Sequence, residues 1–191
     1  MSARQKVLSY LKNNVEKPVT AQELYERFEI ADEQRKYFSE VLEDLVNEGL
    51  LVKNSSGQYG IPEKFNLIAG RIDRSPKGFA FLIPDEPGRE DIFISSENLN
   101  SAMHNDKVFL RLLPDSRGEK DEGEVVKVIE RANKTIVGNL DKSKHFGFVV
   151  PDNKRIFSDV FIPNEKLKGA HQGQKVVAKI EQWPEKKRNP E

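Results

Sequence analysis

An internal repeat limits what this chain can fold into more than any other feature of its sequence. Residues 70–108 read GRIDRSPKGFAFLIPDEPGREDIFISSENLNSAMHNDKV, and residues 138–176 read GNLDKSKHFGFVVPDNKRIFSDVFIPNEKLKGAHQGQKV. Both copies carry a Phe-x-Phe pair, a Pro-Asp pair, an Asp-x-Phe-Ile segment and a Lys-Val pair in the same order. Short apolar runs between turn residues predict strands. The period of the repeat suits one small five-stranded barrel per copy.

Each copy contains a strand that is apolar on both faces, which a single small core does not explain. Side chains alternate along a strand, so Phe79 and Phe81 share one face and Ala80 lies on the other. The one interior of a barrel can be filled by Ala80 and Leu82. We therefore expect three phenylalanines of each copy on the outer surface: Phe79, Phe81 and Phe93 in the first, and Phe146, Phe148 and Phe161 in the second. The alternative is that these rings are core, and that Ala80 and Gly147 mark only tight packing or a bend.

Exposed phenylalanines in such number favour a binding surface, because large apolar patches promote aggregation unless they contact a partner. Unpaired bases suit them, since stacking of a base on an aromatic ring contributes about 1–3 kcal/mol. Nearby cations could follow the phosphates: Arg71, Arg74 and Lys77 in the first copy, and Lys142, Lys144, Lys154 and Arg155 in the second. The pattern predicts an RNA partner, single-stranded or structured.

The first 60 residues have a helical pattern followed by a short hairpin. Apolar residues three and four apart predict helices, the first over residues 2–16. Thr20 with Glu23 forms a capping box at the start of the second helix, and Gly49 stands where the C′ residue of the third is expected. The segment LLVKNSSGQYGIP reads as two strands around a turn. We interpret residues 1–63 as a winged helix-turn-helix.

The predicted fold class is therefore multidomain, α+β and then all-β. The winged helix is followed by two tandem OB-fold barrels, over residues 64–132 and 133–191. After its fourth strand, KVFLRLL, the first copy has a polar loop and a fifth strand, GEVVKVIER. The second copy has KVVAKIEQW, then PEKKRNPE, and reaches Glu191. We expect the second barrel to lack its last strand, as in a truncated chain.

Composition narrows the classes of protein further. The formal net charge is zero, but residues 133–191 carry 12 basic and 7 acidic residues, so a polyanion would favour the last third. The absence of cysteine excludes disulfides and thiolate metal sites, and fits a reducing cytoplasm. His104, His145 and His171 do not have the spacing of metal ligands. Without a long apolar run or a signal peptide, we expect a cytoplasmic monomer that does not contact membranes.

A family resemblance adds to this interpretation. The segments KGFAFLIPD and DIFI resemble the RNA-binding motifs of cold-shock domains, Lys-Gly-Phe-Gly-Phe and then a Val-Phe-Val strand. A winged helix before two such barrels resembles the N-terminal region of the bacterial ribonuclease R family, in the RNase II/RNB group. The resemblance implies the RNA-binding part of a hydrolytic 3′-to-5′ exoribonuclease that releases nucleoside 5′-phosphates. RNA would pass to a catalytic domain absent from this chain, where aspartates hold Mg²⁺, and no cofactor is expected within these residues.

The sequence departs from the cold-shock pattern at several positions. Ser95 and Pro163 stand where cold-shock domains usually carry a histidine. In the second copy His145 replaces the glycine found at Gly78, and Ala80 replaces the usual second glycine of the first copy. We expect stacking to be retained, with fewer bases held by each barrel.

No catalytic or metal-binding residue is predicted within the chain. Asp85 and Asp152 follow prolines in turns, and the matched aspartates of the Asp-x-Phe-Ile segments precede strands. These aspartates recur because the fold recurs. No phosphate-binding glycine loop or nucleophile motif is present in the sequence.

Two alternatives belong to other functional classes. A DNA-binding regulator would read DNA with the third helix, but beyond Arg35 and Lys36 that helix is acidic, which repels phosphate. Its acidic residues are Glu40, Glu43, Asp44 and Glu48. A contact with a protein or the ribosome, or help in opening structured RNA, fits this region better. The second alternative is a non-enzymatic cold-shock-type RNA chaperone or regulator, and the missing fifth strand argues against it.

Overall fold

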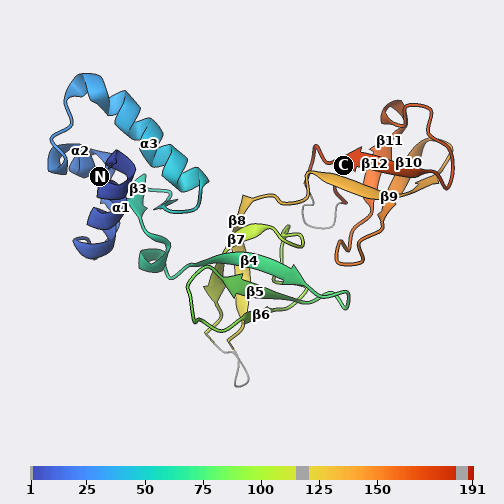
Figure 1. The fold of residues 1–191 in the computed structure, drawn as a ribbon, viewed down its shortest axis with the longest axis horizontal. Helices are drawn as coiled ribbons and strands as arrows, with labels where there is room; N and C mark the ends of the chain where they lie inside the picture. The colour runs from blue at the N-terminus through green and yellow to red at the C-terminus, as the bar shows by residue number, and fades with distance from the viewer. Residues whose placement is uncertain (1, 115–120, 184–188) are drawn as a thin grey trace. The chain divides into compact units, whose positions relative to one another are not determined.

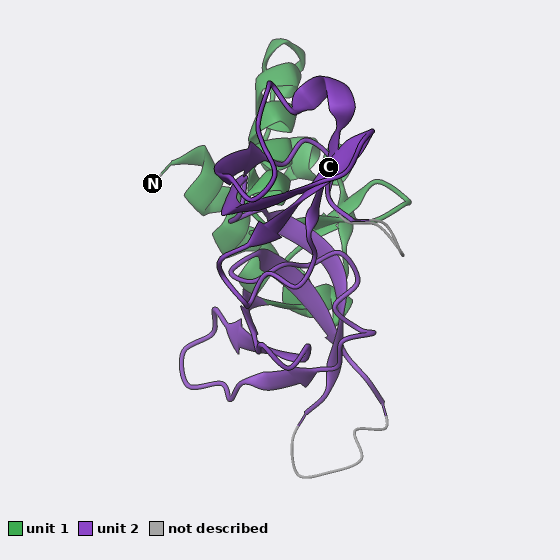
Figure 2. Ribbon diagram, turned by 90° about the vertical axis from the view of Figure 1, so that its right-hand side faces the viewer, with its two compact units in different colours: residues 1–69 green, residues 70–191 purple. Residues whose placement is uncertain are grey.

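A computed structural model describes residues 2–114, 121–183 and 189–191. The chain forms two compact units, residues 1–69 and residues 70–191, which Figure 2 shows in different colours. The first unit contains three α-helices and a small sheet, and the second contains two larger sheets (Figure 1). The division into three domains at residues 63 and 132 stays a prediction.

Side-chain caps and a glycine set the ends of the helices in the first unit. These helices are α1 (Ala3–Asn13), α2 (Ala21–Arg27) and α3 (Arg35–Asn47), the last preceded by a 3₁₀ turn at Asp32–Gln34. The predicted capping box at Thr20 and Glu23 is confirmed, and Ser2 and Gln5 form a second one at α1. Gly49 has a φ of 74°, the left-handed conformation expected at C′.

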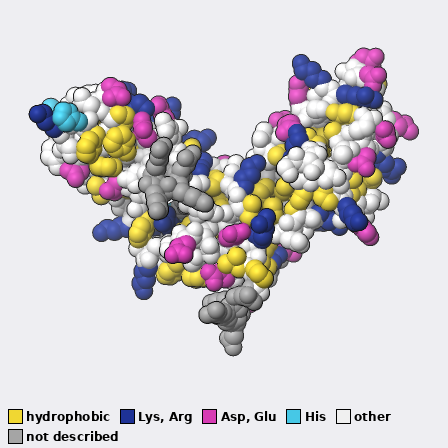
Figure 3. Space-filling view, turned by 180° about the vertical axis from the view of Figure 1, so that it is seen from behind, with side chains coloured by type: hydrophobic (Ala, Val, Ile, Leu, Met, Phe, Trp, Pro, Cys, Tyr) yellow, Lys and Arg dark blue, Asp and Glu magenta, His cyan; other side chains and the backbone are white. Residues whose placement is uncertain are grey.

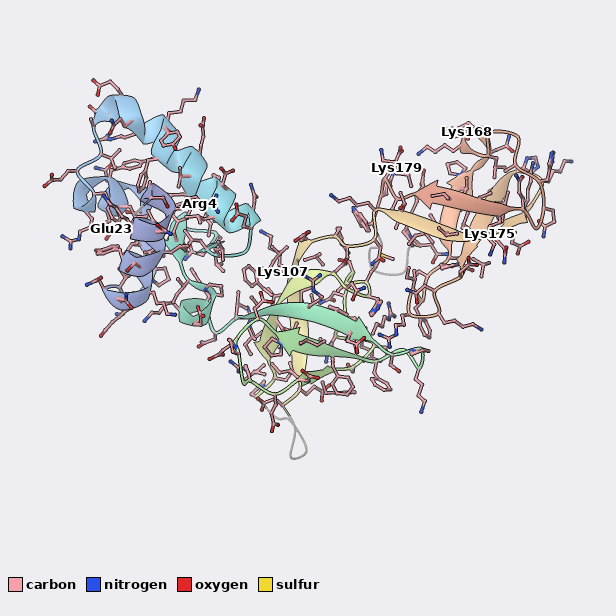
Figure 4. The ribbon with its side chains drawn as sticks, viewed as in Figure 1. Arg4, Glu23, Lys107, Lys168, Lys175 and Lys179 are labelled. Carbon is pink, nitrogen blue, oxygen red and sulfur yellow. The ribbon has the colours of Figure 1, made fainter. Side chains whose placement is uncertain are left out.

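A three-stranded sheet packs with these helices around one core. Its strands are β1 (Val19–Thr20), β2 (Val52–Lys53) and β3 (Gln58–Gly60), in the order β1-β3-β2. The sequence pattern predicts β2 and β3 but not β1, which is too short to show alternation. Leu11, Leu24 and Leu42 come from the three helices and are completely or almost completely buried. In Figure 4, Arg4 on α1 lies near the end of α3, where it pairs with Glu48.

The first copy of the repeat forms a curled sheet of five strands, as its sequence predicts. The strands are β4 (Ile68–Arg74), β5 (Ala80–Pro84), β6 (Ile92–Ile94), β7 (Lys107–Leu112) and β8 (Gly123–Glu130), in the order β6-β5-β4-β7-β8. The pairing of β7 with β8 has two register shifts, and such bulges bend a sheet. The curl brings β6 back towards β8, and the Phe93 N–H donates to the Asp121 carbonyl at 3.0 Å.

The second copy forms a sheet of the same kind. Its strands are β9 (Thr135–Lys142), β10 (Phe146–Pro151), β11 (Val160–Pro163) and β12 (Lys175–Lys179), in the order β11-β10-β9-β12, with a 3₁₀ turn at Asn164–Lys166. The described residues give this sheet four strands. The Phe161 N–H donates to the Pro190 carbonyl at 2.8 Å, the counterpart of the bond from Phe93. Two OB-like curled sheets in tandem are therefore the architecture of the second unit.

Alternate residues of the strands make the two cores. In the first sheet Ile72, Leu82 and Leu110 are fully buried, and in the second Val149 and Val160 are buried in the same way. In β4, β5 and β10, the residues on either side of these core residues are half-buried or exposed, whereas in β7 Phe109 beside Leu110 is buried too. This period of two is what leaves one face of each sheet available for other contacts.

A glycine at the start of each copy has a steric cause. At Gly138 on β9, an added Cβ would lie 2.1 Å from the carbonyl oxygen of Val150 on β10. At Gly70 on β4, it would lie 2.5 Å from the carbonyl oxygen of Ile83 on β5. Only glycine allows the two strands to approach this closely, which explains why the sequence repeats it.

A buried aspartate ties the connection between β6 and β7 to the segment that joins the two sheets. Asp106 is completely buried and pairs with Arg131, with 2.8 Å between Nη1 and Oδ2. The same carboxylate accepts the backbone N–H groups of Met103 and Ala132, each at 2.9 Å. Three donors therefore compensate the buried charge.

Parts of two predicted polar segments, residues 115–120 and 184–188, lie outside the described residues. They include three of the basic residues counted in the last third, Lys186, Lys187 and Arg188. Within the described ranges, none of the helices has the length and apolar character needed to cross a membrane.

Candidate nucleic-acid interface

Three phenylalanines of the first sheet lie together on the face opposite its core. We call Phe79, Phe81 and Phe93 the first Phe cluster. Phe81 on β5 is the direct antiparallel partner of Phe93 on β6, and each pair of rings in the cluster has its centroids 5.8 Å apart. The rings are half-buried, whereas Ala80 and Ile92 between them on the other face are buried. The sheet therefore has the alternation that the sequence predicts.

The second sheet repeats this arrangement. We call Phe146, Phe148 and Phe161 the second Phe cluster. Phe148 on β10 pairs with Phe161 on β11, and the three centroid distances are 5.6, 5.9 and 5.6 Å. Phe146 is the most open of the three, with 37% of its surface exposed. Edge contacts between the rings hold each cluster in one shape and leave part of each ring accessible.

The angles between the rings are also repeated. Phe79 and Phe81 meet at 87°, and Phe146 and Phe148 meet at 80°. The tilted pairs, which involve Phe93 and Phe161, have angles of 39° and 35°. The two copies share only part of their sequence, so the same outward geometry is built twice on different surroundings.

The basic residues predicted to follow phosphates differ in exposure. Arg71, Lys77, Lys144, Lys154 and Arg155 are exposed, and Arg74 and Lys142 are half-buried. Arg71 donates from Nη1 to the Asn105 carbonyl at 2.9 Å. Lys142 donates from Nζ to the Ala170 carbonyl at 2.8 Å. These two bonds hold each cation against the surface of its own sheet.

Two of the predicted arginines take part in contacts between the two sheets. Arg155, in the connection between β10 and β11, forms an ion pair with Asp73 on β4. Arg74, at the end of β4, lies over the ring of Phe157 with its Cζ 4.9 Å from the centroid. Burial lowers the pKa of the Arg74 guanidinium. The repeat does not single out Phe157, because the first copy has no aromatic residue in the corresponding connection.

An apolar groove beside the second Phe cluster was not predicted from the sequence. It has a volume of about 660 Å³, and its lining includes Phe161, Leu140, Val149, Leu167 and Ala178. Lys168 and Lys179 line it too, and Figure 4 shows both, with Lys175, on β12 and the segment before it. The surplus of basic residues in the last third is the one sequence signal that points to these lysines.

Both signs of charge are present on the face of the molecule that Figure 3 shows. On the face shown in Figure 3, Lys and Arg side chains are interspersed with Asp and Glu, and hydrophobic side chains appear between them. Some of the lysines are paired, such as Lys175 with Asp152 at 2.6 Å. A ligand on this face would therefore meet local cations beside hydrophobic side chains, and not one continuous basic field.

Family models match both sheets. Residues 70–128 match the ribonuclease B OB domain, and residues 148–191 match the cold-shock domain. Ribonuclease R of Acidithiobacillus ferrooxidans is 33% identical over 99% of this chain, and that of Thermotoga maritima is 38% identical over 92%. This chain belongs to the ribonuclease R family. Ribonuclease R of Escherichia coli is 31% identical over 95% of the chain.

The similarity concerns one region of the ribonuclease R relatives. The chain covers 43% of the Acidithiobacillus protein, 24% of the Thermotoga protein and 22% of the Escherichia protein. It therefore spans less than half the length of these curated relatives. The similarity extends over the first unit and both sheets, as the sequence resemblance predicts.

Solved structures support the fold. Yeast Ssd1, a pseudonuclease, matches 67% of the chain with a TM-score of 0.55 and 19% identity. Mycoplasma genitalium RNase R, in complex with ribose-methylated single-stranded RNA, matches 60% with a TM-score of 0.52 and 21% identity. The chain covers 22% and 19% of these two structures.

The described residues contain no group of three or more histidines, aspartates and glutamates that could hold a metal ion. The aspartates that precede strands, Asp91 and Asp159, belong to different sheets. The arrangement of this region is suited to contact with rings and phosphates, through paired aromatic surfaces and nearby cations.

Proposed function

We propose that this chain is an RNA-binding region of a ribonuclease R-type exoribonuclease, and that it captures single-stranded RNA by stacking unpaired bases on the two Phe clusters. The observation that carries the proposal is the duplicated geometry of these clusters. In both, two rings are direct partners across antiparallel strands, and a third closes the group at less than 6 Å between centroids. Bases of any sequence can stack on such a surface, because every base has a π-face.

Electrostatics would add affinity without sequence preference. Lys77 and Lys144 stand two residues before the first phenylalanine of their clusters, and both are exposed. Lysines at these positions can meet the phosphates of a strand whose bases lie on the rings. Binding should therefore weaken as salt rises, because neutralised phosphates release counterions.

The first unit supports an auxiliary role. Its three helices and the β1-β3-β2 sheet are consistent with a winged helix-turn-helix. The exposed face of α3 carries acidic residues, so DNA reading by this helix is disfavoured. We propose that this unit contacts a protein or the ribosome, or helps to open structured RNA.

The catalytic part of the function belongs to residues other than these. In this proposal the stacked RNA passes to a catalytic domain, which degrades it as a 3′-to-5′ exoribonuclease with Mg²⁺ as its cofactor. The names of the ribonuclease R relatives support the class of reaction. With RNA as its ligand, we place the protein in the cytoplasm.

The test compares two triple variants with the unchanged chain. Phe146, Phe148 and Phe161 are changed together to alanine in one variant, and the first Phe cluster in the other. Each should bind an unstructured oligouridylate more than tenfold more weakly, since several stacking contacts of about 1–3 kcal/mol are lost. Fluorescence anisotropy measures the affinity, and circular dichroism shows whether the sheets remain folded.

A variant of the buried ring Phe109, which is 2% exposed, is the matched control. Changing Phe109 to leucine should affect stability and leave the affinity unchanged. Equal affinity of folded triple variants and the unchanged chain would refute the stacking proposal. A second measurement adds a catalytic domain and follows the rate of RNA degradation. A nuclease region should accelerate this degradation, whereas an RNA chaperone should not.

A further inference from the structure

A seventh phenylalanine, outside both clusters, is exposed in the connection between β10 and β11. Phe157 has 53% of its surface exposed, more than any ring of the two clusters. Its neighbour Ile156 is 8% exposed and belongs to the core of the second sheet. Phe157 therefore extends from an anchored position.

Local hydrogen bonds fix the connection that carries this ring. The Asn153 side-chain oxygen accepts the Arg155 N–H at 3.0 Å, and the Asn153 carbonyl accepts the Ile156 N–H at 2.9 Å. The guanidinium of Arg155 also pairs with Asp73. A short turn with these three interactions holds Phe157 in a defined direction, which reduces the entropy lost when a ligand contacts it.

Phe157 lies near two residues that lead to the first Phe cluster, Arg74 and Gly78. Arg74 ends β4, and its Cζ lies 4.9 Å from the ring centroid of Phe157. An added Cβ on Gly78 would lie 3.8 Å from Cζ of Phe157, and Gly78 directly precedes Phe79. The ring therefore lies against the turn that opens the first Phe cluster, while its own chain segment joins the strands of Phe148 and Phe161.

The chemistry around the ring suits an unpaired base beside a phosphate. The attraction between the Arg74 guanidinium and the Phe157 ring helps to hold the ring in place, and the accessible part of the ring remains available to a base. Arg74 has a buried Nε without a hydrogen-bond partner among the described residues. Arg74 over the ring, and Arg155 two residues before Phe157, place positive charge where the backbone of a bound strand would pass.

We propose that Phe157, backed by Arg74, is a further base-stacking position that carries single-stranded RNA from one Phe cluster to the other. This inference rests on the proposed function, because it requires RNA on both clusters. In this proposal, one unpaired nucleotide of any sequence lies at the junction of the two sheets. A long oligonucleotide then contacts one continuous path, whereas a very short one contacts a single cluster.

Affinity as a function of RNA length tests this position. Phe157→Leu keeps an apolar side chain against Arg74 but removes the aromatic face. We expect it to weaken binding of a 15-nucleotide oligouridylate about fivefold or more, and to change binding of a 4-nucleotide one less than about twofold. Val126→Ala on β8, at an apolar side chain that is 43% exposed, is the matched control and should leave both affinities unchanged.

Photocrosslinking gives a readout that a packing role would not affect. The 15-nucleotide RNA carries 5-iodouridine at one position at a time, and mass spectrometry identifies the crosslinked peptide. We expect crosslinks at Phe157 for central positions and at the Phe clusters for outer ones. Normal affinity of Phe157→Leu for the long RNA, or crosslinks at the clusters without any at Phe157, would overturn the inference.

The triple variants of the Phe clusters, measured with the same RNA, separate the two proposals. If they bind normally, the proposed function itself is wrong. If they bind weakly while Phe157→Leu binds normally, RNA occupies the clusters but does not pass over Phe157.

Discussion

Phe148 lies directly opposite Phe161 in the antiparallel pairing of β10 with β11, and their ring centroids are 5.6 Å apart. Cross-strand aromatic pairs of this kind stabilise a sheet by less than about 1 kcal/mol. Their energetic contribution to folding is therefore small compared with what a stacked base would gain from them. This difference allows binding and folding to be tested separately.

Replacing Phe161 by leucine should separate these effects. The change nearly conserves volume, so the free energy of unfolding should fall by less than about 1.5 kcal/mol. Loss of one stacking face should weaken binding of single-stranded RNA about fivefold or more. Urea denaturation and fluorescence anisotropy measure the two quantities. A large loss of stability with unchanged affinity would mean that the ring serves packing alone.

The salt dependence of binding should report individual phosphate contacts. For single-stranded RNA, each contact contributes about 0.7 to the slope of log affinity against log salt. Lys144→Gln should lower the magnitude of this slope by about that amount, because Lys144 is exposed beside the second Phe cluster. Lys12→Gln on α1 changes the charge by the same amount away from the Phe clusters, and it is the control that should leave the slope unchanged. An unchanged slope for Lys144→Gln would place the phosphates elsewhere.

The buried carboxylate of Asp106 should be the most sensitive charged position in the second unit. Asp106→Ala leaves two backbone N–H groups without their acceptor and removes the carboxylate that pairs with Arg131, so the free energy of unfolding should fall by about 3–5 kcal/mol. Asp152→Ala also breaks an ion pair, but at the surface, and should cost less than about 1 kcal/mol. If urea denaturation showed the same loss of unfolding free energy for Asp106→Ala and Asp152→Ala, burial of the carboxylate would not be the cause.

Stability should depend on pH through His104. Burial, and then the positive charge of Arg155, lower the pKa of His104 from its ordinary value of 6.5. The unfolded chain therefore binds a proton first as the pH falls below 6.5, and the free energy of unfolding decreases until the folded form is protonated too. Arg155→Gln should raise the pKa of His104, because a repelling charge is removed. NMR titration measures it, and Arg89→Gln, which breaks the surface pair with Glu86, should leave it unchanged.

Replacing Gly138 by alanine should destabilise the second sheet. The new Cβ would meet the Val150 carbonyl oxygen at 2.1 Å, so β9 and β10 would have to separate. We expect the free energy of unfolding to fall by about 1–3 kcal/mol, the range for overpacked sites. Asn139→Ala, at the next and exposed position of β9, is the control. Similar stability of both variants would show that the strands can shift without cost.

Local sequence signals predicted most of the secondary structure. The capping box at Thr20 and the left-handed Gly49 depend on contacts within a few residues, and both are present. The β1 strand was missed, because two residues show no alternation and its only support is pairing with β3. Short elements of this kind exist through tertiary contacts, which a local pattern does not contain.

The sequence by itself determined which face is core in the strands that carry the phenylalanines, because alternation and repetition are local properties of the chain. The outward positions of Phe81 and Phe148 follow from that period of two. Only the tertiary structure decided what lies between the two sheets. Asp73 and Arg155 are 82 residues apart, and Arg74 and Phe157 are similarly distant along the chain. No periodicity connects such pairs, since they meet only through the tertiary arrangement of the two sheets within the second unit.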